Sequence, residues 1–170
     1  MDFLELAKKR YSVRSFKNES ISDEIIRKII DAGYVAPTAC NRQPFKIIAI
    51  SSEEGLAKFK RCTDCHFNAP LAFIVCSDLN IAWQRSFDGK RSGDVDASIV
   101  ATHMMLEAAD LGIGSTWVMF FKPDVVKAEF DLPDNFEPVV CLPMGYPSDE
   151  AKPAPLHSQY RDYGDLVTFA

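Results

Sequence analysis

The chain has 170 residues, of which 47% are hydrophobic and 25% charged, and its formal net charge is -5 at pH 7. This length and composition predict a single globular domain over residues 1–170 and exclude a disordered chain. The negative charge disfavours nucleic acid and anionic membranes as partners, because both are bound by broad basic surfaces.

The first residues and the cysteines predict a cytoplasmic location. No run approaches the ~20 apolar residues that a membrane-spanning helix requires. The chain begins Met1-Asp2-Phe3-Leu4-Glu5, with acidic side chains where a signal peptide carries positive charge. The five cysteines, an odd number, are expected to be free thiols in a reducing compartment.

The first half of the chain is predicted to form three helices and two strands. One helix begins after Ser22, a favourable N-cap, and carries isoleucines at helical spacing before Gly33 and Pro37 end it. The other elements are short runs bounded by polar or turn residues. They are a helix over 3–10, a strand over 45–50, a helix over 52–61 and a strand over 71–76.

The second half contains the longest helical pattern, over residues 95–111. It is apolar nearly all round, which predicts burial in a core or at a subunit interface, and Gly112 follows its end. The connection 77–93 before it has the length and aromatic content of a lid or binding element. Also expected are a strand or extended segment over 115–121, a helix over 123–130 and a strand over 138–144. A short strand is expected over 166–169, and a partner subunit is one candidate for its pairing.

The run Arg10-Tyr11-Ser12-Val13-Arg14 carries the densest binding chemistry. It places two guanidinium groups four residues apart with a hydroxyl between them. A guanidinium can hold two phosphate oxygens at once, and such charge-assisted bonds are about twice as strong as neutral ones. The run therefore predicts a site for a small dianion, and the alternative is a solvated basic turn that contacts nothing.

A second motif, Cys62-Thr63-Asp64-Cys65-His66, has the spacing of a c-type haem attachment site. A structural zinc site would need a second close Cys/His pair, and a thioredoxin-like dithiol would begin a helix, whereas this pair falls where a helix should end. A loop with incidental thiols is the favoured interpretation. A haem or dithiol electron carrier that uses Cys62 and Cys65 remains the alternative.

The sequence offers no obvious catalytic side chains. No histidine accompanies a Gly-x-Ser-x-Gly elbow, no metal site is predicted, and Asp94 and Asp96 are interpreted as charges that cap a helix. Either the protein is not an enzyme, or a cofactor performs the chemistry. Without βαβ alternation or a Gly-rich strand-to-helix turn, an α+β fold is favoured over a doubly wound nucleotide fold.

From about residue 3 to 168, several segments in order resemble the FMN-dependent nitroreductase family. Residues 10–14 are similar to its N-terminal signature for flavin phosphate and ribityl. Residues 36–45 are similar to its second signature, in which a Pro-Ser/Thr pair and an Asn border the isoalloxazine ring. Its later blocks and its C-terminal ending resemble residues 111–118 and 142–147, and then His157, Arg161 and residues 165–167.

The resemblance implies an α+β fold, with a central mixed sheet of four or five strands flanked by helices. It also implies a homodimer with swapped tails and two FMN sites, each built from both subunits. The implied activity is ping-pong hydride transfer from NAD(P)H through flavin N5 to an electron-poor acceptor such as a nitroaromatic or quinone. An FMN-binding sensor or carrier without turnover is the alternative.

The resemblance assigns the cofactor contacts by position and assigns no catalytic residue. Residues of the first signature and of the C-terminal ending would bind the phosphate and ribityl groups of FMN. The second signature of the other subunit would border the ring. A backbone N–H of residues 117–119 would reach N5. The implied contacts are Arg10, Tyr11, Ser12, Arg14 and Arg161, then Pro37, Thr38 and Asn41, and then Trp117, Val118 and Met119. Where the family often carries Asn, Lys or Arg near the pyrimidine, this chain has Cys62, Cys65, His66 and Asn68.

Overall fold

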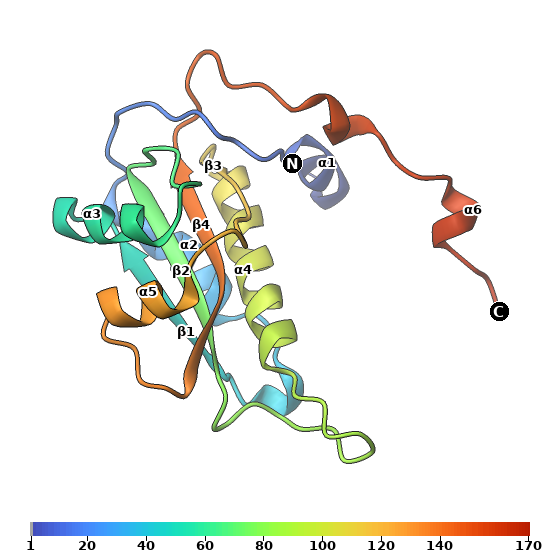
Figure 1. Cartoon of the computed structure of the whole chain (residues 1–170). Helices are drawn as coiled ribbons and strands as arrows, with labels where there is room; N and C mark the ends of the chain where they lie inside the picture. The colour runs from blue at the N-terminus through green and yellow to red at the C-terminus, as the bar shows by residue number, and fades with distance from the viewer. Residues whose placement is uncertain (1) are drawn as a thin grey trace.

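A computed structural model describes residues 2–170, and in it a four-stranded sheet lies between two layers of helices (Figure 1). The strands are β1 (Phe45–Ile50), β2 (Leu71–Asp78), β3 (Gly114–Ser115) and β4 (Phe136–Gly145), in the order β1-β2-β4-β3. The α-helices are α1 (Phe3–Lys9), α2 (Asp23–Tyr34), α3 (Glu53–Cys62), α4 (Gly93–Asp110), α5 (Pro123–Glu129) and α6 (Tyr163–Leu166). Two short 3-10 helices are η1 (Ala39–Asn41) and η2 (Pro155–Ser158).

The α+β class is confirmed, but the expectation of a mixed sheet is wrong. All three strand pairs of the sheet are antiparallel, and parallel pairing is confined to an isolated bridge between Ser12 and Ser115. Apolar periodicity reports which residues are buried and says nothing of strand direction, which is set by the connections between strands.

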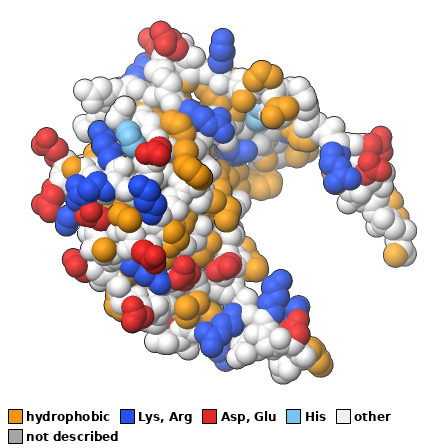
Figure 2. All heavy atoms as spheres, viewed as in Figure 1, with side chains coloured by type: hydrophobic (Ala, Val, Ile, Leu, Met, Phe, Trp, Pro, Cys, Tyr) orange, Lys and Arg blue, Asp and Glu red, His pale blue; other side chains and the backbone are white. Residues whose placement is uncertain are grey.

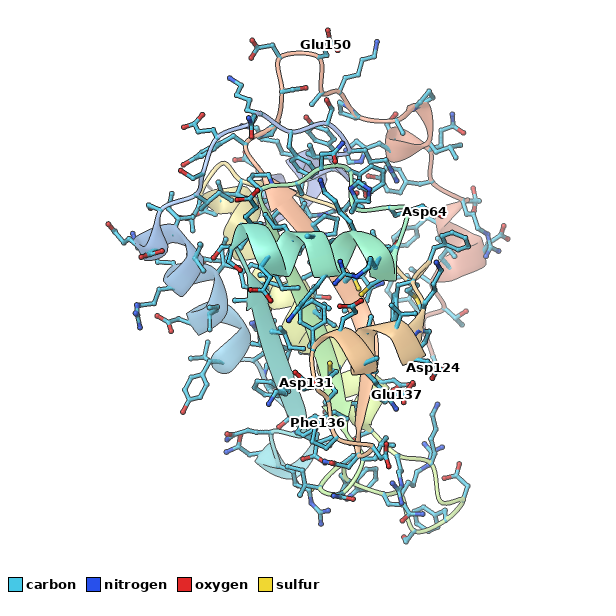
Figure 3. The ribbon with its side chains drawn as sticks, turned by 60° about the vertical axis from the view of Figure 1, so that its left-hand side comes forward. Asp64, Asp124, Asp131, Phe136, Glu137 and Glu150 are labelled. Carbon is cyan, nitrogen blue, oxygen red and sulfur yellow. The ribbon has the colours of Figure 1, made fainter. Side chains whose placement is uncertain are left out.

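Strand β2 is buried on both faces because alternate residues point to opposite sides of a strand. Leu71, Phe73 and Val75 pack in one core cluster with α2 and α4. Ala72, Ile74 and Cys76 pack in the other, with α3 and α5. Figure 3 shows α3 and α5 together over this second face, with Asp64 beyond the end of α3 and Asp124 at the start of α5.

The predicted helices of the first half are confirmed, with local corrections at α2. The Ser22 hydroxyl accepts a hydrogen bond from the Ile25 N–H at 3.4 Å, as its N-cap role predicts. Gly33 does not end the helix. A Cβ there would lie 2.7 Å from Met104 Cγ, so this glycine lets α2 approach α4 closely.

The second half departs from expectation at two strands. The strand expected over 115–121 is reduced to Gly114–Ser115 and an isolated bridge between Val118 and Cys141. The strand expected over 166–169 is not formed within residues 2–170, where Leu166 ends α6 and residues 167–169 have no strand partner. Its pairing with a partner subunit stays a prediction.

Two segments project from the same side of the body (Figure 1). One is the tail, residues 159–170, which leaves the body beyond η2. The other is the arm, residues 79–92, closed by an antiparallel bridge between Gln84 and Arg91. Within residues 2–170, no helix combines the length and the apolar character needed to cross a membrane.

Candidate functional site

The basic run lies against β3, at the C-terminal end of α4. The Val13 N–H donates to the Ser115 carbonyl at 2.9 Å, and Arg10 Nη1 lies 3.9 Å from Met105 Sδ of α4. Gly114 makes this approach possible, because a Cβ there would lie 2.6 Å from Val13 Cγ2. The sheet edge therefore fixes the backbone from which Arg10, Ser12 and Arg14 project.

A cavity of about 200 Å³ opens beside this run. Its walls are largely apolar, and Lys9, Arg10 and Tyr11 supply the polar groups. Ser12 and Arg14 are not among its lining residues, so the structure brings only part of the first signature to it. The lining residues are Leu6, Lys9, Arg10, Tyr11, Val13, Ala109, Gly112, Ile113, Gly114, Ser115 and Pro147.

The guanidinium groups of the run are not neutralised within the chain. Across residues 2–170, no carboxylate lies within ion-pair distance of Arg10 or Arg14. Arg14 Nη1 donates to the Ser12 carbonyl at 3.2 Å in an exposed position. Two cations without a carboxylate partner, one of them lining a cavity, fit the phosphate of FMN.

The three predicted flavin contacts that follow β3, residues 117–119, differ in burial. Val118 is buried, and its N–H donates to the Cys141 carbonyl at 2.9 Å, so this amide is unavailable to a ligand. Trp117 is half-buried, and Met119 is exposed at 70%. Of the three predicted contacts, Trp117 and Met119 are the ones whose side chains remain accessible.

The second signature forms the η1 loop, residues 37–43, at the N-terminal end of α4. Cys40, Asn41 and Gln43 have φ values of 52°, 50° and 52°, a region that side chains other than glycine rarely adopt. The Thr38 hydroxyl accepts from the Gln43 N–H at 3.0 Å. The Ala39 N–H donates to Asp96 Oδ1 at 2.9 Å, which joins the loop to α4.

One chain does not bring the two signatures together. The loop is tied to Asp96, and the cavity is lined by Ala109, 13 positions later on the same helix. At 1.5 Å per residue these positions lie about 20 Å apart along α4. The structure therefore places one half of the predicted site at each end of this helix.

Helix η2, just before the tail, is docked on the basic run, and Arg161 lies beyond this docked part. His157 Nε2 lies 3.2 Å from the Lys8 carbonyl, and its ring packs edge-on against Tyr11 at 6.3 Å between centroids. Arg161 is 70% exposed, with an ion-pair distance of 3.9 Å to Asp165. Arg10 lines the cavity beside the basic run and Arg161 does not, so within residues 2–170 the two arginines do not share this cavity.

The cysteine motif has the properties of structural thiols. Cys62 ends α3 fully buried, and burial raises the pKa of its thiol to about 11, which leaves almost no thiolate near neutral pH. His66 Nδ1 accepts from the Asn68 N–H at 3.0 Å, and burial lowers the pKa of this imidazole. Residues 2–170 contain no cluster of three or more His, Cys, Asp or Glu arranged to hold a metal ion.

Asp96 is the residue that sequence reasoning misjudged. It was expected to cap α4, but its side chain is 2% exposed and accepts from Ala39 N–H and Ser92 Oγ. A carboxylate in the first turn of a helix is normally a surface group. The only signal was its position within an otherwise apolar pattern.

Comparison with known proteins places this geometry in a family. The profile described as "Nitroreductase family" matches residues 7–64 and 63–146. A crystal structure of a nitroreductase family protein from Clostridium difficile 630 is 42% identical, with a TM-score of 0.93, over 99% of this chain and 98% of that one.

Two further relatives carry names that describe activity. An FMN-dependent nitroreductase from Clostridium difficile R20291 is 26% identical, with a TM-score of 0.80, over 98% of each chain. A protein from Staphylococcus haemolyticus named NADPH-dependent oxidoreductase is 27% identical over 168 residues, which cover 89% of this chain and 67% of the relative. On the profile match and the shared fold, the chain belongs to the nitroreductase family.

Proposed function

We propose that the protein is an FMN-dependent oxidoreductase that takes electrons from NAD(P)H and delivers them to an electron-poor small molecule. The observation that carries this proposal is the pair of half-sites at the two ends of α4, one cationic and one built from the η1 loop. The names of the relatives from Staphylococcus haemolyticus and Clostridium difficile R20291 support the donor and the cofactor. Free thiols at every cysteine fit a cytoplasmic setting.

The chain's own residues would bind and orient the cofactor. Arg10, Ser12 and Arg14 would hold phosphate and ribityl, and Tyr11 lines the cavity beside them. Pro37, Thr38 and Asn41 would border the ring, while Trp117 and Met119 exclude water from it. When bound at these residues, FMN would supply the redox chemistry, which is hydride transfer from NAD(P)H to the acceptor in two half-reactions. No side chain is assigned as a general acid.

A second copy of the chain would complete each site. A two-fold axis across the middle of α4 places the η1 loop of one protomer beside the basic run of its partner, because the two helices then run antiparallel. The outer face of α4 is suited to this contact. Two surface grooves run along this face, and the α4 residues that line them are Val95, Ser98, Ile99, Thr102, His103 and Leu106.

The surface around that face is apolar and concave. Figure 2 shows hydrophobic side chains gathered along the wall between the projecting tail and arm. Phe3 is 67% exposed, Val35 72% and Val95 53%, which is unusual for clustered apolar side chains in a monomer. The tail, with exposed Tyr160 and Phe169, would wrap the partner and carry Arg161 toward an FMN phosphate.

The proposal is tested on the purified protein by flavin absorbance and by turnover with NADH and NADPH. We expect bound FMN, bleaching of its absorbance by one or both nucleotides, and recovery on addition of a quinone or nitroaromatic. Bound FMN that neither nucleotide reduces would indicate a sensor or carrier. Replacing Cys62 and Cys65 by serine should leave FMN binding intact, and redox activity that is lost with these thiols while FMN stays bound would contradict the proposal.

A further inference from the structure

Asp96 is a buried carboxylate whose two oxygens hold two different parts of the chain. Its side chain is 2% exposed, with Oδ1 accepting from the Ala39 N–H at 2.9 Å and Oδ2 from the Ser92 hydroxyl at 2.6 Å. Burying a carboxylate is costly unless it is fully hydrogen-bonded. The two bonds give each oxygen one donor and offset part of that cost, and together they tie Asp96 to two segments that are distant from each other in sequence.

The first segment is the η1 loop, whose backbone needs such a tether. Three of its residues, Cys40, Asn41 and Gln43, have positive φ. Non-glycine residues persist in that region only where surrounding contacts over-determine the backbone. Within the loop, Thr38 and Asn41 bond to Gln43, at 3.0 and 3.1 Å, whereas the bond to Asp96 ties the loop to the body.

The second segment is the base of the arm. Ser92 closes the arm through its N–H, which donates to the Trp83 carbonyl at 2.9 Å, while its hydroxyl donates to Asp96. One carboxylate thus links the loop that borders the proposed ring site to the long connection beside it. A displacement of either segment would therefore change the position of the other through the side chain of Asp96.

We propose that Asp96 is a positioning residue that fixes the η1 loop in its ring-bordering conformation and couples it to the arm. The loop's role toward the flavin rests on the proposed function. The tether itself does not, because both hydrogen bonds exist in the chain without any ligand. Loop order can therefore be measured separately from flavin binding.

Hydrogen exchange of the ligand-free protein is the first readout, and FMN affinity is the second. Asp96→Leu should raise the exchange rate of the Ala39–Asn41 amides at least tenfold and weaken FMN binding about tenfold, as expected for loss of a charge-assisted bond. Asp96→Asn keeps an oxygen that can accept from the Ala39 N–H and an amide that can bond to the Ser92 hydroxyl. Its loop exchange rates and FMN affinity should therefore stay within about threefold of the wild type.

Two further variants separate the tether from helix stability. Asp94→Asn removes an exposed carboxylate from the same first turn of α4 and should change neither readout. Ala39→Pro removes the donor without altering α4, and the extended backbone of Thr38 (φ -132°, ψ 159°) is compatible with a following proline. It should reproduce the faster exchange at the Cys40 and Asn41 amides, since proline itself has no N–H, and it decides the matter if Asp96→Leu does not fold.

Unchanged loop exchange in a folded Asp96→Leu protein, or in Ala39→Pro, would overturn the positioning role. Equal effects of Asp94→Asn and Asp96→Leu would also overturn it, because helix-terminal charge would then be the cause. If the wild-type protein binds no FMN, the proposed function fails, yet the exchange measurement still decides whether Asp96 orders the loop.

Discussion

The two ends of α4 hold their binding residues by different physical means. At the C-terminal end, a glycine contact and a strand bridge fix the backbone, and the arginine side chains remain free of carboxylates. At the N-terminal end, a buried carboxylate holds a loop of positive-φ residues. The first end offers charge to a ligand and the second offers a fixed shape. A cofactor with an anionic end and a flat apolar end needs both.

The largest effect is expected from separating the protomers, because this would leave every half-site alone. Thr102 lies near the middle of α4 on the groove-lining face, so it would meet its own copy close to a two-fold axis. Thr102→Glu should therefore give a monomer in sedimentation experiments and remove FMN binding. The control, Ala128→Glu at an exposed position of α5, should stay dimeric and retain FMN. A dimer that keeps FMN despite Thr102→Glu would contradict the α4 interface.

A change at Gly114 should break only the C-terminal end. Its new Cβ would meet Val13 at 2.6 Å, so Gly114→Ala should displace the basic run and lower the free energy of unfolding by about 1–3 kcal/mol. Flavin affinity, measured by titration, should fall as well. Gly33→Ala creates a comparable clash with Met104 at 2.7 Å and should cost stability without weakening FMN binding. Equal affinities of the two variants would refute the assigned role of β3.

Arg10→Gln tests the charge alone. A hydrogen bond to a charged group contributes about 1.5–3 kcal/mol, so FMN should bind roughly 10- to 100-fold more weakly. Inorganic phosphate should compete with FMN in the wild type and much less in this variant. Arg27→Gln, an exposed change on α2, serves as the control. Unaltered FMN affinity in Arg10→Gln would show that the cavity does not hold the phosphate.

The smallest effect on FMN binding is expected from the buried thiols, which lie at neither end of α4 and act on stability alone. Burial raises the pKa of Cys62 to about 11 and of Cys76 to about 12 from an ordinary value of 9.0. Below pH 9 both thiols are neutral in the folded and in the unfolded protein. Between pH 9 and 11 they ionise mainly in the unfolded protein, which favours unfolding. Each pKa unit corresponds to about 1.4 kcal/mol. Unfolding free energy should thus fall between pH 9 and 11, and Cys62→Ser should flatten that fall, as urea titrations would show.

The sequence predicted the elements that depend on local patterns. The Ser22 cap, the period of β2 and the long apolar helix were all readable, because capping and periodicity act within a few residues. The direction of the strands was not readable, and neither was the short α6, since these depend on contacts or geometry outside the local pattern. The strand expected over 115–121 was shortened where Val118 enters the second core.

The candidate site was predictable in its residue types but not in its assembly. The two signatures could be identified as motifs, yet only the structure shows them at opposite ends of one helix. The hydrogen bond between Asp96 and Ala39 was not predictable, because a contact across 57 positions leaves no local pattern. The same holds for the close approach of Gly114 to Val13.

Subunit complementation tests the central claim most directly. Arg10→Glu should disable one half of every site and Thr38→Trp the other half, so neither homodimer should bind FMN. A heterodimer of the two variants, purified with different tags, contains one site with both native halves if each site is shared between protomers. We predict one FMN per heterodimer, whereas a heterodimer as empty as its parents would show that each chain builds its site alone.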